Sequence, residues 1–291
     1  MASEFISWRG HRIHVTESGD GDPLLLVPGL GNNIEMWVPF MEQFSNRRII
    51  RLDAPGTGLS STPLCPVSVP ALGDLLVAVL DHLEVQHADV VGFSYGGAVA
   101  QQLAFDHPTR VHRLVLAATN CGIGAVPGWL PAVTGLATPL RYYSPSFFDR
   151  TAAATFGGVT ARDSAVRRRM IDARRCHPPA ADGYALQLMG IFGWSSWYFL
   201  EHIPHETLVI CGDDDPLVPV ANARMLAGRI PNASLEIVEG GGHLFLWDDA
   251  QSLAQRIGRF LDAPKVERRS GPSRSRARAR RYSRSVSRAT A

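Results

Sequence analysis

The chain has 291 residues, of which 45% are hydrophobic, so it can bury a substantial core as one large domain or as a domain with an insertion. It holds no apolar run of the roughly 18 residues that a membrane span needs, and its first residues lack the profile of a signal peptide, which favours a cytoplasmic protein. The net charge of +2 conceals an asymmetry, because residues 265–291 carry nine arginines and one lysine against one glutamate, whereas the rest of the chain is net acidic.

The first segment, "FISWRGHRIHVTES", alternates in polarity around "RG" and predicts an antiparallel hairpin. Short apolar runs follow it, and runs of this kind are typical of parallel strands that are buried on both faces. These runs are "PLLLVPG", "RRIIRLDAP", "ADVVGFS", "RLVLAAT", "TLVICGD" and "SLEIVEG". Helical patterns separate several of them, at about residues 68–84, 95–107, 220–230 and 248–262. Strands that alternate with helices predict α/β architecture, a mostly parallel sheet with helices on both faces.

The stretch "GFSYGG", residues 92–97, follows an apolar run and places Ser94 among glycines. A strand can turn into a helix within two residues only where the flanking side chains are nearly absent, which Gly92 and Gly96 allow and Gly97 extends. Such a turn leaves the hydroxyl at its tip, away from the core. The alternative is an ordinary junction in which the serine caps a helix.

A serine hydroxyl becomes a nucleophile near neutral pH only when an imidazole takes its proton and a carboxylate orients that imidazole. "TLVICGDDDPLVP" supplies three candidate carboxylates, Asp213, Asp214 and Asp215, at the end of a predicted strand. "SLEIVEGGGHLFL" supplies His243 at the end of the next predicted strand. We select Asp215, which follows Gly212 by three residues and leads into the next helix. Asp213 and Asp214 are expected to face solvent or to cap that helix. The other nine histidines are interpreted as surface or packing residues.

Acyl transfer also needs two donors for the oxyanion. We assign these to the backbone N–H of Tyr95 and to that of Leu30, which lies between two glycines in "VPGLGNN" at the end of an earlier strand. A merely flexible turn is the alternative for "PGLG". The G-x-G of "RLDAPGTGLSS" lacks the third glycine of a dinucleotide loop, so we interpret it as a tight turn anchored by Asp53.

More than eighty residues separate "RLVLAAT" from "TLVICGD", and this stretch is rich in aromatic residues. A connection of this length predicts an inserted cap, whose aromatic residues mostly form its own core while a minority face the cleft. The expected organisation is a first core part at 1–119, a cap at 120–206, a second core part at 207–264 and a tail at 265–291. The tail is predicted to be disordered, because it has almost no large apolar residues.

The elbow serine, the acid loop, the histidine loop and the oxyanion loop, in this order, resemble the α/β-hydrolase superfamily over about residues 5–262. Serine at the elbow argues against its dehalogenases and epoxide hydrolases. The stretches "SYGGAVAQQLAFDHP" and "GWSSWYFLEHI" are further similar to intracellular polyhydroxyalkanoate depolymerases of the medium-chain-length type. This resemblance implies hydrolysis of 3-hydroxyacyl polyester in cytoplasmic granules, with a triad of Ser94, Asp215 and His243. Tyr95 departs from that family, where tryptophan is expected, and the arginine-rich tail lies outside its pattern.

Several alternatives stay open at this stage. A carboxylesterase or lactonase for small substrates, or a cofactor-free perhydrolase, would use the same triad, and a non-catalytic binding protein could keep the fold. No metal or organic cofactor is expected, and four dispersed cysteines without a C-x-x-C pair argue against a disulfide framework or a thiolate zinc site. The basic tail could contact a phospholipid-coated granule or a nucleic acid through charge.

For a polyester substrate we expect an apolar cleft without a charged anchor for a free carboxylate. The cap stretch "GIFGWSSWYFL" brings together four aromatic residues that could line this cleft or could all be buried in the cap. These are Trp194, Trp197, Tyr198 and Phe199.

Overall fold

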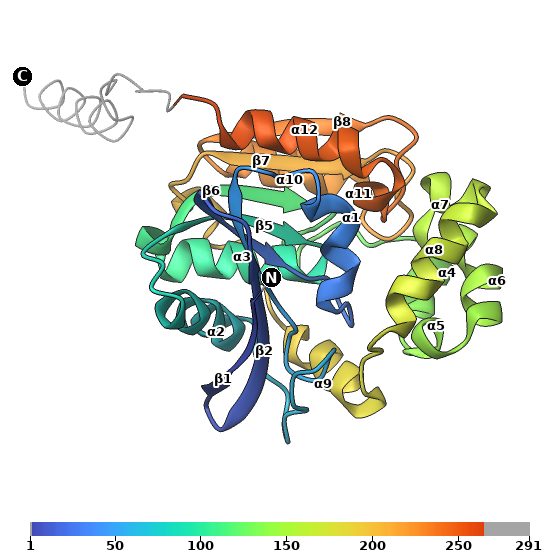
Figure 1. The fold of residues 1–291 in the computed structure, drawn as a ribbon. Coiled ribbons are helices and arrows are strands. Elements are labelled where there is room, and N and C mark those ends of the chain that lie inside the picture. Colours follow the sequence, from blue (N-terminus) through green and yellow to red (C-terminus); the bar gives the residue numbers. More distant parts are fainter. Residues whose placement is uncertain (1, 265–291) are drawn as a thin grey trace, which may run out of the picture. The chain divides into compact units, whose positions relative to one another are not determined.

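An eight-stranded sheet forms the centre of the computed structural model, which describes residues 2–264 (Figure 1). Its strands are β1 (Ala2–Trp8), β2 (His11–Ser18), β3 (Asp22–Val27), β4 (Arg47–Leu52), β5 (Ala88–Phe93), β6 (Val111–Ala117), β7 (Thr207–Gly212) and β8 (Ala233–Val238). Their order across the sheet is β1-β2-β4-β3-β5-β6-β7-β8. β2 pairs antiparallel with β1 and β4, and the strands from β4 to β8 in this order pair in parallel. The predicted mostly parallel sheet is confirmed.

The hairpin of β1 and β2 confirms the prediction made from "RG". Trp8 pairs with His11, so only Arg9 and Gly10 form the turn. Both have positive φ, 49° and 80°, which is the backbone of a two-residue turn that follows the twist of its strands. The hairpin extends the parallel strands at the β4 side of the sheet.

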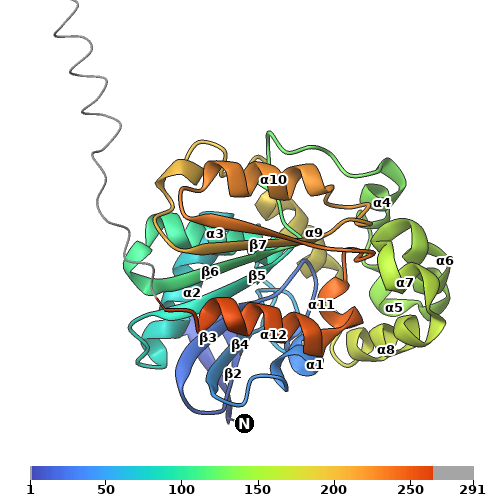
Figure 2. The same ribbon diagram turned by 90° about the horizontal axis from the view of Figure 1, so that it is seen from above.

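Helices cover both faces of the sheet, as Figures 1 and 2 show. α2 (Val69–His82), α3 (Tyr95–Asp106) and α10 (Val220–Arg229) contribute to one hydrophobic cluster, and α1 (Val38–Met41), α11 (Phe245–Asp248) and α12 (Ala250–Leu261) contribute to the other. All four helices that the sequence predicts are present, within two residues of the expected ends. The shorter 3-10 helices are η1 (Ile34–Trp37), η2 (Pro108–Arg110) and η3 (Leu200–His202).

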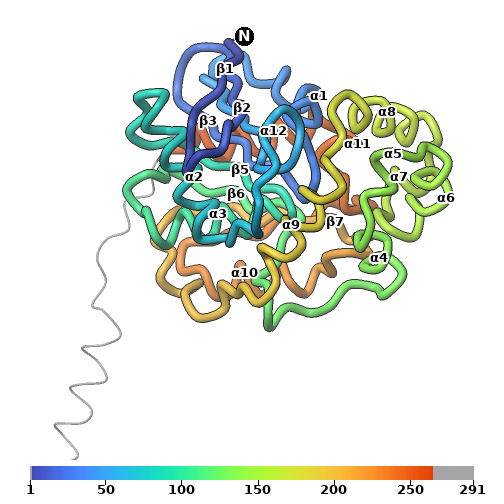
Figure 3. Tube along the Cα trace, turned by 90° about the horizontal axis from the view of Figure 1, so that it is seen from below, coloured from blue at the N-terminus to red at the C-terminus, as the bar shows by residue number. Residues whose placement is uncertain are grey.

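The long connection between β6 and β7 is mostly helical. It contains α4 (Leu130–Gly135), α5 (Leu140–Tyr143), α6 (Pro145–Phe156), α7 (Gly158–Arg162), α8 (Ser164–Arg175) and α9 (Ala181–Ile191). α4 to α8 gather at one side of the molecule, and α9 lies apart from them (Figures 1 and 3). α4, α6 and α8 share a hydrophobic cluster with α11 and α12, whereas Trp194 and Leu200 in the returning segment pack into the cluster of α2 and α3. We call this connection the cap.

Residues up to Leu261 form one compact unit, so the boundaries between core and cap stay an interpretation of the sequence. The predicted tail, residues 265–291, lies outside the described residues. Within residues 2–264, no helix is long and apolar enough to cross a membrane.

Candidate active site

Ser94 stands at the turn between β5 and α3, where the sequence predicts a nucleophile elbow. Its φ of 52° and ψ of −115° are unusual for a residue with a side chain, and such a conformation costs on the order of 1–3 kcal/mol. Two hydrogen bonds fix the turn: Ser94 N–H donates to the carbonyl of Ala117 (2.8 Å), and the Thr119 hydroxyl donates to the carbonyl of Ser94 (2.8 Å). The end of β6 and the segment that follows it therefore hold the strained residue in place.

Close packing around the elbow explains its glycines. A Cβ on Gly96 would lie 2.2 Å from the carbonyl oxygen of Val27, and one on Gly97 would lie 2.5 Å from the Thr119 side chain. A Cβ on Gly92 would meet both the Ala100 side chain and the Gly96 carbonyl at 2.6 Å. The expectation that the elbow requires glycine for steric reasons is thus confirmed at three positions.

The hydroxyl, the imidazole and the carboxylate chosen from the sequence lie in one hydrogen-bonded chain. Ser94 Oγ is 3.0 Å from His243 Nε2, and His243 Nδ1 is 2.8 Å from Asp215 Oδ2. The imidazole and the carboxylate are buried, and Nδ1–H donates to the carboxylate, because a carboxylate can only accept. Nε2 is then left free to accept from the serine hydroxyl.

The three consecutive aspartates have different partners. Asp215 Oδ1 accepts from the N–H groups of Leu217 (2.8 Å) and Val218 (3.0 Å), so Oδ2 is left facing His243. Asp213 is exposed and accepts from Gly240 N–H (2.6 Å). Asp214 is also exposed but bonds to the cap, where its Oδ2 accepts from Gly158 N–H and from the Arg162 guanidinium.

The loop after β3 lies at the same site, because Leu30 lines a pocket together with Ser94 and His243. The Gly29 carbonyl accepts from Asn32 N–H (3.0 Å) within this turn. Since a trans peptide points its N–H opposite to its carbonyl, the Leu30 N–H points away from the turn. The Leu30 carbonyl accepts from the Tyr142 hydroxyl (2.6 Å), and Gly31 N–H donates to Gln187 (3.0 Å). Two cap residues therefore hold this loop.

The pocket at Ser94 contains about 300 Å³ of empty space, part of it open to solvent. Its lining combines apolar side chains with two cap arginines, Arg141 of α5 and Arg174 of α8, which are 5% and 2% exposed. The expectation of a cleft without a charged anchor is wrong. The sequence did contain one signal, because Arg174 follows the buried residues Val166 and Met170 at four-residue intervals on the same helix face.

The two arginines have different environments. Arg141 donates to the Tyr184 hydroxyl (2.7 Å) and more weakly to the Leu30 carbonyl (3.4 Å). Arg174 lies 4.7 Å from the ring centre of Phe148 and 5.1 Å from that of Phe156, and among the described residues its Nε and Nη1 have no hydrogen-bond partner. Burial lowers the pKa of Arg174 to about 10, so its guanidinium stays charged at neutral pH.

The sequence left open whether the four cap aromatics line the cleft, and none of them lines the pocket at Ser94. Trp194 is buried and donates to Gln102 of α3 (2.7 Å), Phe199 stacks on Phe105 with ring centres 4.4 Å apart, and Arg229 lies 4.1 Å from the Trp197 ring centre. Tyr198 is 83% exposed. These side chains fasten the returning segment of the cap to the core or face solvent. Aromatic groups reach the pocket at Ser94 from other positions, Phe93, Tyr142 and Phe156.

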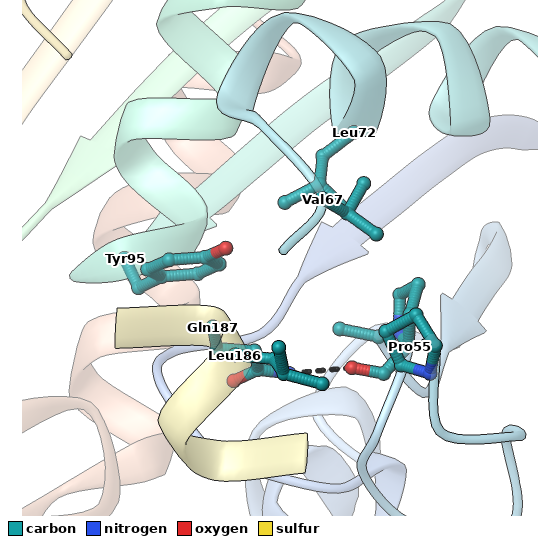
Figure 4. Close-up of a pocket in the computed structure, with 8 residues that line it drawn as sticks. Pro55, Val67, Leu72, Tyr95, Leu186 and Gln187 are labelled. Atoms are coloured by element: carbon teal, nitrogen blue, oxygen red, sulfur yellow. Dashed lines mark hydrogen bonds between the residues drawn. The ribbon is translucent and has the colours of Figure 1, made fainter. Parts of the chain in front are cut away.

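A second, apolar pocket lies beside Tyr95. Figure 4 shows the Tyr95 ring opposite Leu186 and Gln187 of α9, with Val67 and Leu72 nearby. Gln187 fixes this wall by donating to the Pro55 carbonyl (3.1 Å). The Tyr95 hydroxyl is buried without a hydrogen-bond partner in the described part of the chain, and burial raises its pKa.

The turn "RLDAPGTGLSS" has the structural role that the sequence predicts. Asp53 accepts from Ile34 N–H (2.9 Å), Leu59 N–H (3.0 Å) and His14 Nδ1 (2.7 Å). A Cβ on Gly58 would lie 2.1 Å from the Asp53 carboxyl carbon. The loop is therefore packed around a carboxylate. Among residues 2–264, no group of three or more His, Cys, Asp or Glu side chains could hold a metal ion.

Known proteins share this fold. The family model described as alpha/beta hydrolase fold matches residues 22–250. A poly(3-hydroxyalkanoate) depolymerase of Ectopseudomonas oleovorans is 43% identical over 82% of this chain and 84% of its own length. A 2-hydroxymuconate semialdehyde hydrolase of Pseudomonas sp. (strain CF600) is 30% identical over 87% of this chain and 91% of its own. The crystal structure of a hydrolase from Pseudomonas aeruginosa PA01 is 26% identical and superposes with a TM-score of 0.75 over 90% of this chain and 98% of that one.

Proposed function

The chain belongs to the alpha/beta hydrolase fold family, and from this premise we propose that it is a serine hydrolase that cleaves ester bonds with Ser94, His243 and Asp215. The observation that carries this proposal is the chain of hydrogen bonds from Ser94 Oγ through His243 to Asp215, with the serine on a strained turn. Neither the strain nor the buried polar groups would be needed for a serine that only caps a helix.

The reaction proceeds in two halves. Ser94 Oγ attacks the ester carbonyl carbon while His243 Nε2 takes the hydroxyl proton, and His243 then gives this proton to the leaving alcohol as the ester C–O bond breaks. A water molecule, deprotonated by the same nitrogen, attacks the acyl-enzyme and releases the acid and the serine hydroxyl. Asp215 fixes the tautomer of His243 and stabilises the imidazolium that forms in each half.

The negative charge on the carbonyl oxygen is stabilised by two backbone donors in this proposal, Tyr95 N–H and Leu30 N–H. The first position of α3 supports the role of Tyr95, because the first N–H groups of a helix lack partners within the helix. The orientation of the Gly29–Leu30 peptide supports the role of Leu30.

For the substrate we propose poly(3-hydroxyalkanoate), from which the enzyme releases 3-hydroxyalkanoic acids or short oligomers. The 43% identity to a depolymerase over 82% of the chain supports this assignment. Association with a cytoplasmic polymer granule is part of the same proposal. A soluble carboxylesterase or lactonase with the same triad is the alternative.

Three measurements test the proposal. Replacing Ser94 by Ala should lower turnover of a p-nitrophenyl acyl ester by about 10³-fold or more, and a fluorophosphonate probe should label wild type but not this variant. Substantial turnover by the variant would contradict the assignment of the nucleophile. Amorphous polyhydroxyalkanoate granules with long or with methyl side groups, offered beside a series of soluble esters, test the substrate. Cleavage of soluble esters alone would favour the small-ester hydrolase.

A further inference from the structure

Two positive charges at the catalytic pocket have no negative partner. Arg141 and Arg174 both line the pocket that contains Ser94 and His243, and no ion pair to an acidic side chain is found for either of them among residues 2–264. The side chains around them are tyrosines and phenylalanines, which contact both guanidinium groups at 4.6 to 5.8 Å from the ring centres.

A buried, unpaired guanidinium is unfavourable for folding, because removal of a charge from water has a large free-energy cost that aromatic contacts offset only in part. Arg174 is 2% exposed, and two of its nitrogen atoms lack any hydrogen-bond acceptor in the described structure. An anionic ligand would supply the missing negative charge and hydrogen-bond acceptors, so this unpaired guanidinium indicates a binding site for an anion.

The two arginines are not equivalent. Arg141 donates to Thr138, Tyr184 and the Leu30 carbonyl, so its hydrogen bonds already support the cap and the loop after β3. Arg174 Nε and Nη1 have no partner in the described structure, and each can donate a charge-assisted hydrogen bond to a carboxylate oxygen. The binding group is therefore Arg174, and Arg141 adds a second positive charge to the same pocket.

We propose that Arg174, supported by Arg141, binds a free carboxylate of the substrate next to the ester bond that Ser94 attacks. This inference rests on the proposed serine hydrolase function. The substrate class is an ester that carries a carboxylate within the same pocket and apolar groups against Leu136, Phe156 and Leu244, which also line it. In a 3-hydroxyacyl polyester this group exists only at the acid end of the chain, so the enzyme would bind that end and release one hydroxyacid at a time.

The test compares matched esters with and without the carboxylate. One pair is the 3-hydroxyoctanoate dimer as free acid and as methyl ester, in which the carboxylate belongs to the leaving alcohol. The other pair is mono-p-nitrophenyl glutarate and p-nitrophenyl pentanoate, in which it belongs to the acyl group. Wild type should prefer the free acid in at least one pair by about 10- to 100-fold in kcat/KM, the range expected for a charge-assisted hydrogen bond.

Arg174→Met should abolish this preference, because the free acid should lose more kcat/KM than its matched partner in the same pair. Arg175 is exposed and follows directly on the same helix, so Arg175→Met removes the same charge outside the pocket and should keep the preference. If Arg174 only packed against aromatic rings, its replacement would lower the two members of each pair equally. That result, or equal rates on both members in wild type, would overturn the subsite while leaving the hydrolase assignment intact.

The pair of esters that shows the preference for the free acid identifies the substrate class. A preference confined to the dimer supports the acid end of a polyester, whereas one confined to the glutarate ester supports the subsite with a small dicarboxylate half-ester as substrate.

Urea unfolding tests the subsite without a measurement of turnover. Because Arg174 is an unpaired buried charge, Arg174→Met should be at least as stable as wild type, and 3-hydroxyoctanoate should stabilise wild type but not this variant. Failure of the whole function would appear separately, as unchanged turnover in Ser94→Ala.

Discussion

Replacement of Asp215 by Asn tests the assignment of the acid most sharply, since only one of three consecutive aspartates should respond. Asp215 Oδ1 accepts from two backbone N–H groups, of Leu217 and Val218. An amide at this position must therefore keep its oxygen there and turn its NH₂ toward His243 Nδ1. Nδ1 then has to accept, which moves the imidazole proton to Nε2 and leaves no base for the Ser94 hydroxyl.

The expected loss in kcat is about 10⁴-fold, the magnitude found when a triad imidazole is held in the wrong tautomer, and this corresponds to about 5 kcal/mol of activation free energy. The assay is the initial rate on p-nitrophenyl octanoate, with thermal unfolding to show that the variant is folded. Asp213→Asn is the matched control, because an amide oxygen can still accept from Gly240 N–H. Loss of less than about tenfold in Asp215→Asn, or an equal loss in Asp213→Asn, would refute this reasoning.

Four further outcomes are expected. Burial raises the pKa of Asp248 to about 6. Its contribution to stability is therefore present below its unfolded pKa and is lost as the pH rises through about 6. In urea unfolding, the free energy of unfolding of Asp248→Asn relative to wild type should rise by on the order of 1–2 kcal/mol between pH 4 and pH 7.5. Gly96→Ala should lower the free energy of unfolding, measured in urea, by about 1–3 kcal/mol, because its Cβ would overlap the Val27 carbonyl. Gly228→Ala has open space around the Cβ on α10, so its free energy of unfolding should be unchanged or up to about 1 kcal/mol higher. Deletion of residues 265–291 should leave turnover of soluble esters unchanged and weaken salt-sensitive binding to granules or nucleic acid, and loss of soluble-ester turnover would contradict it. Chelation with EDTA should leave activity intact, and recovery only after addition of a metal would contradict this.

The sequence was most informative at the ends of the strands. Ser94, Asp215 and His243 follow β5, β7 and β8, and the carboxyl ends of neighbouring parallel strands meet at one edge of a sheet. Patterns of nearby residues therefore predicted the strands and helices, and they also placed these three side chains at the same edge of the sheet. The choice of Asp215 from its spacing after Gly212 agrees with the geometry, since its neighbours bond elsewhere.

The cap could not be predicted in the same way. Its short helices are positioned by packing against the core, and no sequence period specifies which aromatic residue reaches the pocket. Trp194 and Phe199 pack against α3, and Trp197 lies beside Arg229 of α10. Phe156 reaches the pocket instead, from the end of α6. Of the cap residues that line the pocket, only Arg174 could have been noticed in the sequence, because it is an arginine on the apolar face of α8.

Close backbone contacts join the cap to the loop that carries His243. His243 N–H donates to the Phe156 carbonyl (2.6 Å), and a Cβ on Gly242 would lie 2.2 Å from that same oxygen. Asp214 bonds to Gly158 on the same stretch of the cap. A change in the position of α6 must therefore move the loop that carries the imidazole. Under the proposed mechanism we expect substitutions in α6 to alter kcat and KM together, because α6 contacts both the pocket at Ser94 and the loop of His243.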